Sequence, residues 1–456
     1  MKSNIYILTA LLIPAMLMGC SKKEDTKIVQ EETELKQEAE ESVEVKEDAE
    51  TEESTPEADA AEEAVQEEKT GEAQSGELSE AELLQIEKDF NEVKWNGFLQ
   101  SEYQSPERIY WDEALYNGGG IETSASDELI EAYLKEIKEE ELLGDLTVVE
   151  TKELEEFVEA TTKKPYSDAV YPLSWTYLTD YDAYILQHGD TNYMEVKLIS
   201  GEISDGVYQV VYEKGLYDDN PVSYEITFTK EEDGYCFRSN LWKPEGKDRE
   251  TAAKELYDEV IKKYIKAIND RLDGSELESS GLSYLCSYAP GYYGDGRDPL
   301  EEIGCYYEDV DDDGIDELFI GKNSEDGYIE TIYQAFSVEH GQCSSFIDGG
   351  ERERYYLAPD KTFYCEASES AFRSSLVHSK MEGPYRMLMT IDGVVYNSEP
   401  EEETGKGPYF YTTFNLWDTN MMEPINEESY SDYMKKAQEE YVNVKYTPFI
   451  EYSPEN

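Results

Sequence analysis

Residues 303–320 read IGCYYEDVDDDGIDELFI, two strand-like apolar segments joined by an acidic loop. Residues 308–317 contain seven carboxylates, and no cation follows until Lys322. If segments 303–307 and 318–320 pair as strands, they hold both ends of this loop together. Like charges crowded between paired strands would destabilise the pairing, whereas a bound divalent cation would offset them. The stretch therefore predicts a strand, a cation-binding loop and a second strand.

The loop carries the oxygen ligands that Ca²⁺ prefers, of which the ion takes about six to eight. Asp309, Asp311 and Asp313 occupy alternate positions, and Gly314 permits a tight left-handed bend. We therefore predict Ca²⁺ as the cofactor. The predicted metal ligands are Asp309, Asp311, Asp313, the main-chain carbonyl of Ile315 and Glu317.

The spacing Asp-x-Asp-x-Asp-Gly-x-x-Glu-Leu resembles the calcium loops of integrin-type FG-GAP repeats and of dockerin-like modules. It departs from an EF-hand, which has a bidentate Glu at its twelfth position, because that position is Ile320 here. The resemblance implies calcium binding without a helix-loop-helix unit. The alternative is an acidic hairpin turn left to solvent.

The loop belongs to a predicted β-rich folded segment, residues 249–456, that follows a linker at 243–248. A long amphipathic helix is expected from the linker to about residue 272. Three hairpins are expected beyond the loop, with turns at His340-Gly341, Pro359-Asp360 and Asp392-Gly393. A closing helix is expected from Asn426.

An earlier segment, residues 78–243, begins with helices and continues with strands. Ser79 and Glu82 form a capping-box pattern, and helices are expected from there, over 127–143 and after Thr151. Alternating apolar residues then predict four consecutive strands between 194 and 242, joined by tight turns. Helices grouped before an antiparallel meander indicate an α+β fold. The topology resembles the cystatin-like or nuclear-transport-factor-like (NTF2-like) cone, in which a curved sheet wraps a helix.

The chain is strongly acidic: of its 456 residues, 105 are Asp or Glu and 39 are Lys or Arg, so the formal charge is −66. Such a chain repels phosphate backbones, which excludes nucleic acid as an expected partner. The 38 Tyr and 13 Phe nevertheless supply enough aromatic area for a core.

The N-terminus has the features of an export signal over residues 1–19, with Lys2 followed by an apolar run too short to span a bilayer. The sequence Leu17-Met18-Gly19-Cys20 resembles the bacterial lipobox, which implies cleavage before Cys20 and lipidation of its thiol. Acyl chains on Cys20 would hold the protein on the cell membrane, facing outward. Residues 20–77 are acidic and poor in large apolar side chains, which predicts a disordered tether.

Five cysteines remain besides Cys20, and no pair has the C-x-x-C spacing of zinc or thioredoxin-like sites. Oxidised and reduced states both stay open, and four cysteines in the second segment would allow three pairings. The five are Cys236, Cys286, Cys305, Cys343 and Cys365.

The chain also resembles the uncharacterised two-domain surface lipoproteins of Gram-positive bacteria. The resemblance rests on Gly97-Phe98-Leu99 to Glu102-Tyr103, on residues 114–118 (ALYNG) and on Ile303-Gly304 before the acidic loop. It implies no assigned activity. Our first hypothesis is a membrane-anchored extracellular module that binds Ca²⁺ and contacts a cell-wall, glycan or protein ligand. The alternative is an extracellular glycan hydrolase that uses two carboxylates.

Overall fold

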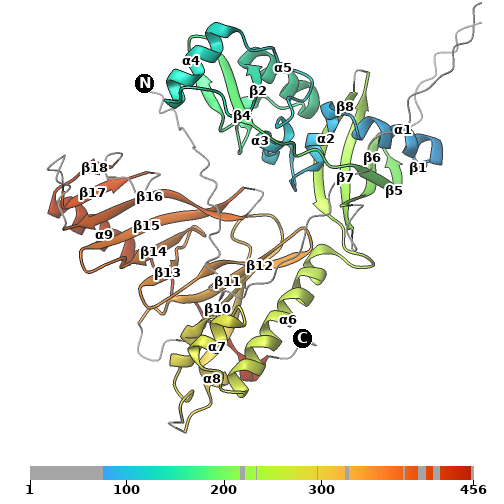
Figure 1. Ribbon diagram of the computed structural model, residues 1–456. Coiled ribbons are helices and arrows are strands. Elements are labelled where there is room, and N and C mark those ends of the chain that lie inside the picture. The colour runs from blue at the N-terminus through green and yellow to red at the C-terminus, as the bar shows by residue number, and fades with distance from the viewer. Residues whose placement is uncertain are drawn as a thin grey trace, which may run out of the picture. The chain divides into compact units, whose positions relative to one another are not determined.

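The computed structural model describes residues 75–452, apart from 216–220, 233, 295, 324–327, 384–385, 399–406 and 414–421 (Figure 1). The described chain is mixed α+β, as predicted, with three antiparallel sheets. The predicted signal peptide, Cys20 and most of the predicted tether lie outside the described residues. The last two tether residues form strand β1 (Gly76–Glu77), which pairs with β5 (Val196–Ser204).

The helix start at Ser79 is confirmed. Helix α1 (Glu80–Phe90) has the complete capping box: the Glu82 N–H and the Ser79 N–H each donate to the other residue's side chain. Leu78 and Leu83 both pack over Gly201 of β5, so the helix entry is fixed against the sheet. The short helices α2 (Val93–Asn96) and α3 (Trp111–Ala114) follow.

The predicted helix over 127–143 was too long, because α4 (Asp127–Ile137) ends at a left-handed Lys138 with φ of 60°. Acidic residues 139–141 follow directly. Negative charges at a helix C-terminus oppose the helix dipole, which explains the early end. The helix predicted after Thr151 is confirmed as α5 (Thr151–Thr162), with Leu154, Phe157 and Val158 buried.

The predicted meander is confirmed: β5, β6 (Val207–Lys214), β7 (Val222–Glu231) and β8 (Gly234–Trp242) pair in chain order. Its inward face packs aromatic rings on the first helices, with Phe90 centred 5.3 Å from Phe228. A further sheet was not predicted. It consists of β2 (Asp145–Glu150), β4 (Ala183–His188) and β3 (Thr176–Leu178), in that order, and α4 packs on it.

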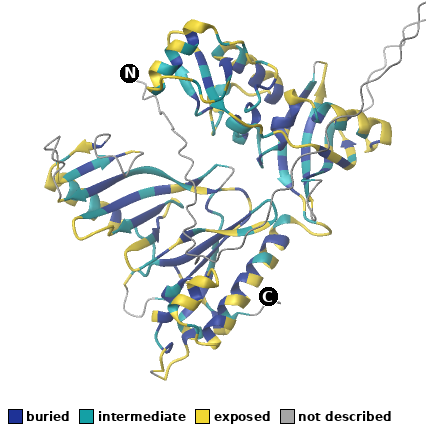
Figure 2. Cartoon of the chain, in the orientation of Figure 1, coloured by how far each residue is buried: buried dark blue, intermediate teal, exposed yellow. Residues whose placement is uncertain are grey.

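The second segment begins with α6 (Arg249–Asn269), whose buried face includes Val260, Tyr264 and Ala267 as predicted. Its strands form one sheet in the order β18-β17-β16-β15-β14-β13-β11-β10-β9-β19, with β12 paired to β11. Helix α6 packs on β11 and β12, and α9 packs on β16 and β17. Figure 2 shows the buried residues concentrated along these strands and on the inward face of α6.

The bounds of this segment's remaining elements complete the description. The helices are α7 (Gly274–Ser279), α8 (Pro299–Glu302) and α9 (Glu427–Glu439), and α9 is capped by the predicted Asn426. The strands are β9 (Ile303–Glu308), β10 (Glu317–Lys322), β11 (Ile332–Glu339), β12 (Gln342–Asp348), β13 (Glu353–Leu357), β14 (Phe363–Ala367), β15 (Arg373–Glu382), β16 (Met387–Asn397), β17 (Tyr409–Thr412), β18 (Glu423–Pro424) and β19 (Thr447–Pro448).

Two of the three predicted hairpin turns are confirmed, at His340-Gly341 and at Pro359-Asp360. The turn predicted at Asp392-Gly393 was wrong, because both residues lie inside β16. A Cβ on Gly393 would lie 2.7 Å from the carbonyl oxygen of Leu376. This glycine therefore permits close approach of two strands next to a register shift, and it does not mark a turn.

The five described cysteines are unpaired in the structure, and four of them are buried. Burial raises the pKa of the Cys305 thiol to about 12 and that of Cys343 to about 11. These thiols therefore act as small core residues.

We expect Asn240→Ala to destabilise the protein by about 2 to 4 kcal/mol, measured by urea unfolding. The buried Asn240 side chain accepts from the Tyr212 hydroxyl at 3.0 Å and donates to the Ser101 carbonyl at 2.9 Å. Its removal takes away both of these buried hydrogen bonds, and the Tyr212 hydroxyl keeps only its contact with the Leu99 carbonyl at 3.2 Å. Arg238→Ala, on the exposed side of the same strand, should change stability by no more than about 0.5 kcal/mol. Equal effects would contradict this role.

Candidate metal centre

The acidic loop is held at both ends by a paired hairpin, as predicted. Strands β9 and β10 are antiparallel neighbours, and Glu308 lies opposite Glu317 at their loop ends. Gly314 has φ of 82°, the left-handed bend expected of it. Asp312 is also left-handed, at 56°, a conformation that Asp tolerates better than most residues.

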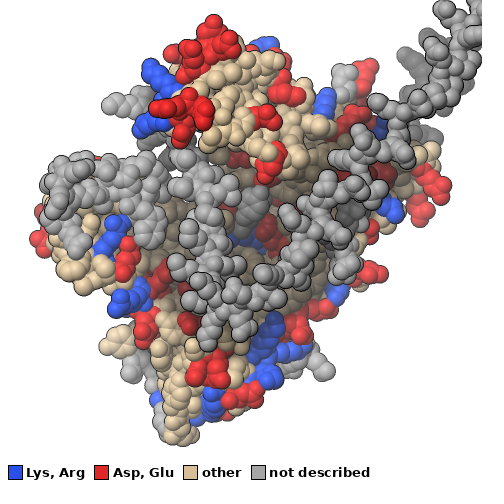
Figure 3. Space-filling view, in the orientation of Figure 1, with Lys and Arg blue, Asp and Glu red and all other residues tan. Residues whose placement is uncertain are grey.

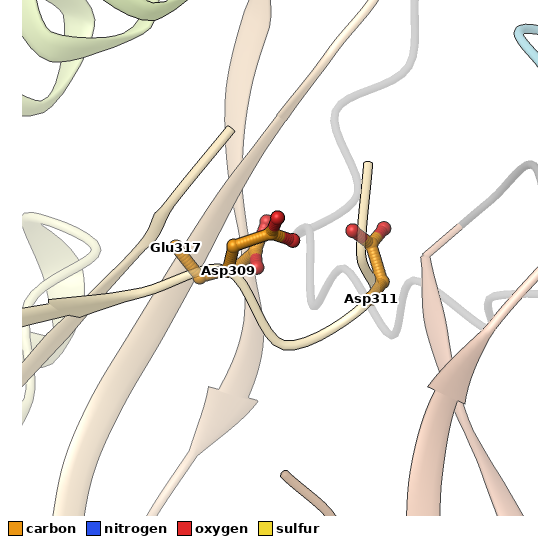
Figure 4. A group of neighbouring side chains, drawn as sticks. All are labelled: Asp309, Asp311 and Glu317. Atoms are coloured by element: carbon orange, nitrogen blue, oxygen red, sulfur yellow. The ribbon is translucent and has the colours of Figure 1, made fainter. Parts of the chain in front are cut away.

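Three carboxylates of the loop gather at one point. One oxygen from each of Asp309, Asp311 and Glu317 lies within 4.8 Å of the others, close enough to bind one metal ion together. Figure 4 shows the three side chains on the same stretch of loop and strand. This cluster could hold a metal ion.

Backbone amides donate hydrogen bonds to all three of these side chains. The Asp313 N–H lies 3.1 Å from both Asp309 Oδ1 and Asp311 Oδ1, and the Gly314 N–H donates to Asp309 Oδ2 at 3.1 Å. The Val310 N–H donates to Glu317 Oε2 at 2.9 Å. The backbone N–H groups of the loop therefore bind the carboxylate oxygens of the same loop.

Asp313 lies outside this cluster, although the sequence placed it among the ligands. Its buried carboxylate lies 2.5 Å from Arg386 Nη2 and 3.2 Å from Arg249 Nη2. Its Oδ1 accepts from the Ile315 N–H at 2.7 Å. Ile315 itself has a buried side chain. The structure thus brings together Asp309, Asp311 and Glu317 and turns Asp313 toward two arginines.

Asp312 is turned outward. Its side chain is 71% exposed and pairs with Lys361 at 2.5 Å, which lowers the pKa of Asp312. It contributes nothing to the cluster.

The loop gathers more acidic groups than paired arginines. Its Asp311, Asp313 and Glu317 pair with Arg386, Asp313 also pairs with Arg249, and Arg249 is shared with Glu102. A bound cation would offset part of this negative charge.

Burial makes ionisation of the cluster costly. It raises the pKa of Glu317 to about 9, and the nearby negative charge of Asp311 adds to this. Burial, with the charge of Asp313, raises the pKa of Asp311 to about 6 despite Arg386. Burial also raises the pKa of Asp309. All three carboxyls therefore hold protons more tightly than usual when no cation is bound.

Glu317 also has an unsatisfied atom. The residue is fully buried, and its Oε1 has no hydrogen-bond partner. The nearest cation, Arg386 Nη1, lies 3.7 Å away, beyond hydrogen-bond distance, and has no hydrogen-bond partner either. Buried oxygens without a hydrogen bond are rare.

A small cavity of about 30 Å³ adjoins the loop. Its lining includes Arg108, Tyr110 and Tyr171 on one side and Asp311 and Arg386 on the other. It has room for about two water molecules.

Sequence reasoning missed the arginines. Arg386 is 73 residues from its partner Asp313, and Arg249 is 64 residues away. Neither belongs to a periodic pattern or motif, so only the folded chain brings them to the loop.

No protein-family model, curated protein or solved structure matches the chain.

We expect the metal-free protein to lose stability as the pH rises from about 5 toward 9. The Glu317 pKa is higher in the folded state than its ordinary value, so its contribution is complete at low pH and is lost as Glu317 ionises. Urea unfolding in chelator at several pH values measures this loss. Glu317→Gln, which cannot ionise, should flatten the profile. If stability fell with pH equally in the variant and the wild type, Glu317 would not be the group whose ionisation causes the loss.

We expect Arg386→Met to destabilise the protein by about 3 to 5 kcal/mol, because it leaves the buried Asp313 carboxylate short of a counter-charge. The double variant Arg386→Met with Asp313→Asn should recover part of the loss. A double-mutant cycle in chelator measures the coupling. Purely additive effects would count against the ion pair.

Proposed function

We propose that the protein is a membrane-anchored extracellular lipoprotein whose acidic loop binds Ca²⁺, and that it acts as a surface binding or structural module. The observation that carries the calcium site is the buried Oε1 of Glu317, which has no hydrogen-bond partner, in a side chain beside Asp309 and Asp311. Its nearest cation, Arg386, is 3.7 Å away and also pairs with Asp311 and Asp313, so a bound cation would stabilise the ionised carboxylate.

Calcium fits the donor set best among common ions. The three clustered side chains offer oxygen alone, without histidine or cysteine, which favours a hard cation. Calcium loops of extracellular modules need dissociation constants of only about 10⁻⁴ to 10⁻³ M.

The proposed location rests on the sequence. The signal-like residues 1–19 and the lipobox-like Cys20 support lipid anchoring of an outward-facing chain. Among the described helices, none combines the length and the apolar character needed to cross a membrane. Acidic and basic side chains are interspersed on the face shown in Figure 3, which agrees with a partner other than nucleic acid.

The first segment supports a further structural proposal, a cystatin-like or NTF2-like relationship. Its helices precede the four-strand meander and pack on one face of it through Phe90, Trp95 and Phe98. The additional sheet of β2, β4 and β3 is an insertion relative to that simple plan.

The clustered acids of the loop do not favour the alternative function, a glycan hydrolase that uses two carboxylates. Asp311 and Glu317 do have raised pKa values, as a carboxylate pair in catalysis can. However, Glu317 is fully buried, and the adjoining cavity is about 30 Å³, far smaller than a sugar ring requires.

We expect Ca²⁺ at ten times its dissociation constant to stabilise the full-length chain by about 1.4 kcal/mol relative to chelator. Asp311→Ala should abolish the gain, because it removes a clustered ligand. Asp312→Ala, the matched outward-facing control, should keep it. Thermal unfolding in calcium and in EGTA measures the difference. An identical melting temperature in both buffers for the wild type would exclude the site.

A further inference from the structure

The acidic loop is also a contact point between residues 75–243 and residues 249–452. Arg108, from the first segment, donates from Nη2 to the main-chain carbonyl of Asp311 at 2.7 Å. Arg108 is itself positioned by Tyr171, whose hydroxyl lies 3.2 Å from the same nitrogen. One loop residue, Asp311, thus offers its side chain to the metal cluster and its carbonyl oxygen to the other segment.

A second connection runs through Asp313. Arg249 bridges the Asp313 carboxylate at 3.2 Å and the Glu102 carboxylate of the first segment at 3.5 Å. Glu102 is nearly buried and also accepts the N–H groups of His340, at 3.0 Å, and Trp242, at 3.1 Å.

Glu102 stays charged in this position. Burial opposes its ionisation, but the interactions with His340, Arg386 and Arg249 together outweigh burial and lower the Glu102 pKa to about 2. At the same contact, a Cβ on Gly341 would lie 2.8 Å from Trp242 Nε1, so the β11–β12 turn packs tightly on β8. The contact between the two segments is therefore polar and closely packed. The acidic loop contributes to it through Asp311 and Asp313.

We propose that Ca²⁺ binding to the loop strengthens the docking of the first segment on the second. This inference rests on the proposed calcium site and adds its regulation. The bound ion holds the side chain of Asp311 in place. It thereby also fixes the main-chain carbonyl of Asp311, which accepts the hydrogen bond from Arg108. Linkage is reciprocal, so docking must in turn raise the affinity for the ion.

The direction in which one substitution changes the calcium affinity distinguishes this coupling from simple electrostatics. Arg108 and Lys361 each place a positive charge beside the loop. By Coulomb's law alone, removal of either charge should strengthen cation binding. Under the proposal, Arg108→Met weakens calcium binding, because it removes the contact that docking adds. Lys361→Met is the matched control, since Lys361 pairs with Asp312 within the second segment.

The experiment is calorimetric titration of the full-length chain and both variants with Ca²⁺ alone. We expect Arg108→Met to lower the affinity by at least about five-fold. Lys361→Met should leave it unchanged or raise it slightly. If both variants bind Ca²⁺ equally well or better than the wild type, the coupling is overturned and the calcium site stands. If the wild type gives no binding, both proposals fall.

Hydrogen exchange of the wild type provides a second measurement that needs no variant. The His340 amide of the second segment, which donates to Glu102 of the first, should exchange more slowly in Ca²⁺ than in EGTA. Helix α4, which packs in a separate hydrophobic cluster, serves as the internal control. Unchanged exchange at the His340 amide in a chain that binds Ca²⁺ would overturn the proposal.

Discussion

The carboxylate of Asp313, 5% exposed and held between Arg386 and Arg249, is the interaction on which the loop region depends. A hairpin that closes over several acidic side chains cannot persist unless positive charge is brought to it. The chain supplies that charge from two distant places, the start of α6 and the residue just before β16. The same ion pairs therefore tie the long helix and the far side of the sheet to the loop.

This arrangement divides the negative charges of the loop into two groups. Asp313 is neutralised permanently by guanidinium groups, which cannot leave and cannot lose their charge. Asp309, Asp311 and Glu317 are left with too little positive charge nearby. A proton, or the proposed metal ion, would complete the balance there.

Sequence reasoning succeeded where the signal was local. The Ser79 capping box, the His340-Gly341 turn and the bend at Gly314 each depend on residues within a few positions of one another. It failed where a distant neighbour decided the outcome. Gly393 has the composition of a turn, yet the strands on both sides of it make it part of β16. Asp313 has the spacing of a metal ligand, yet its carboxylate pairs with Arg386, 73 residues along the chain.

That last difference changes the role expected of the metal. From sequence, the crowded acids require a divalent ion for the strands to pair at all. With two arginines already beside the loop, and with Glu317 able to hold a proton, the hairpin can form without it. We therefore propose that the ion, by displacing a proton and holding Asp311 in place, acts on the groups that the loop contacts. One of these groups is Arg108 of the first segment.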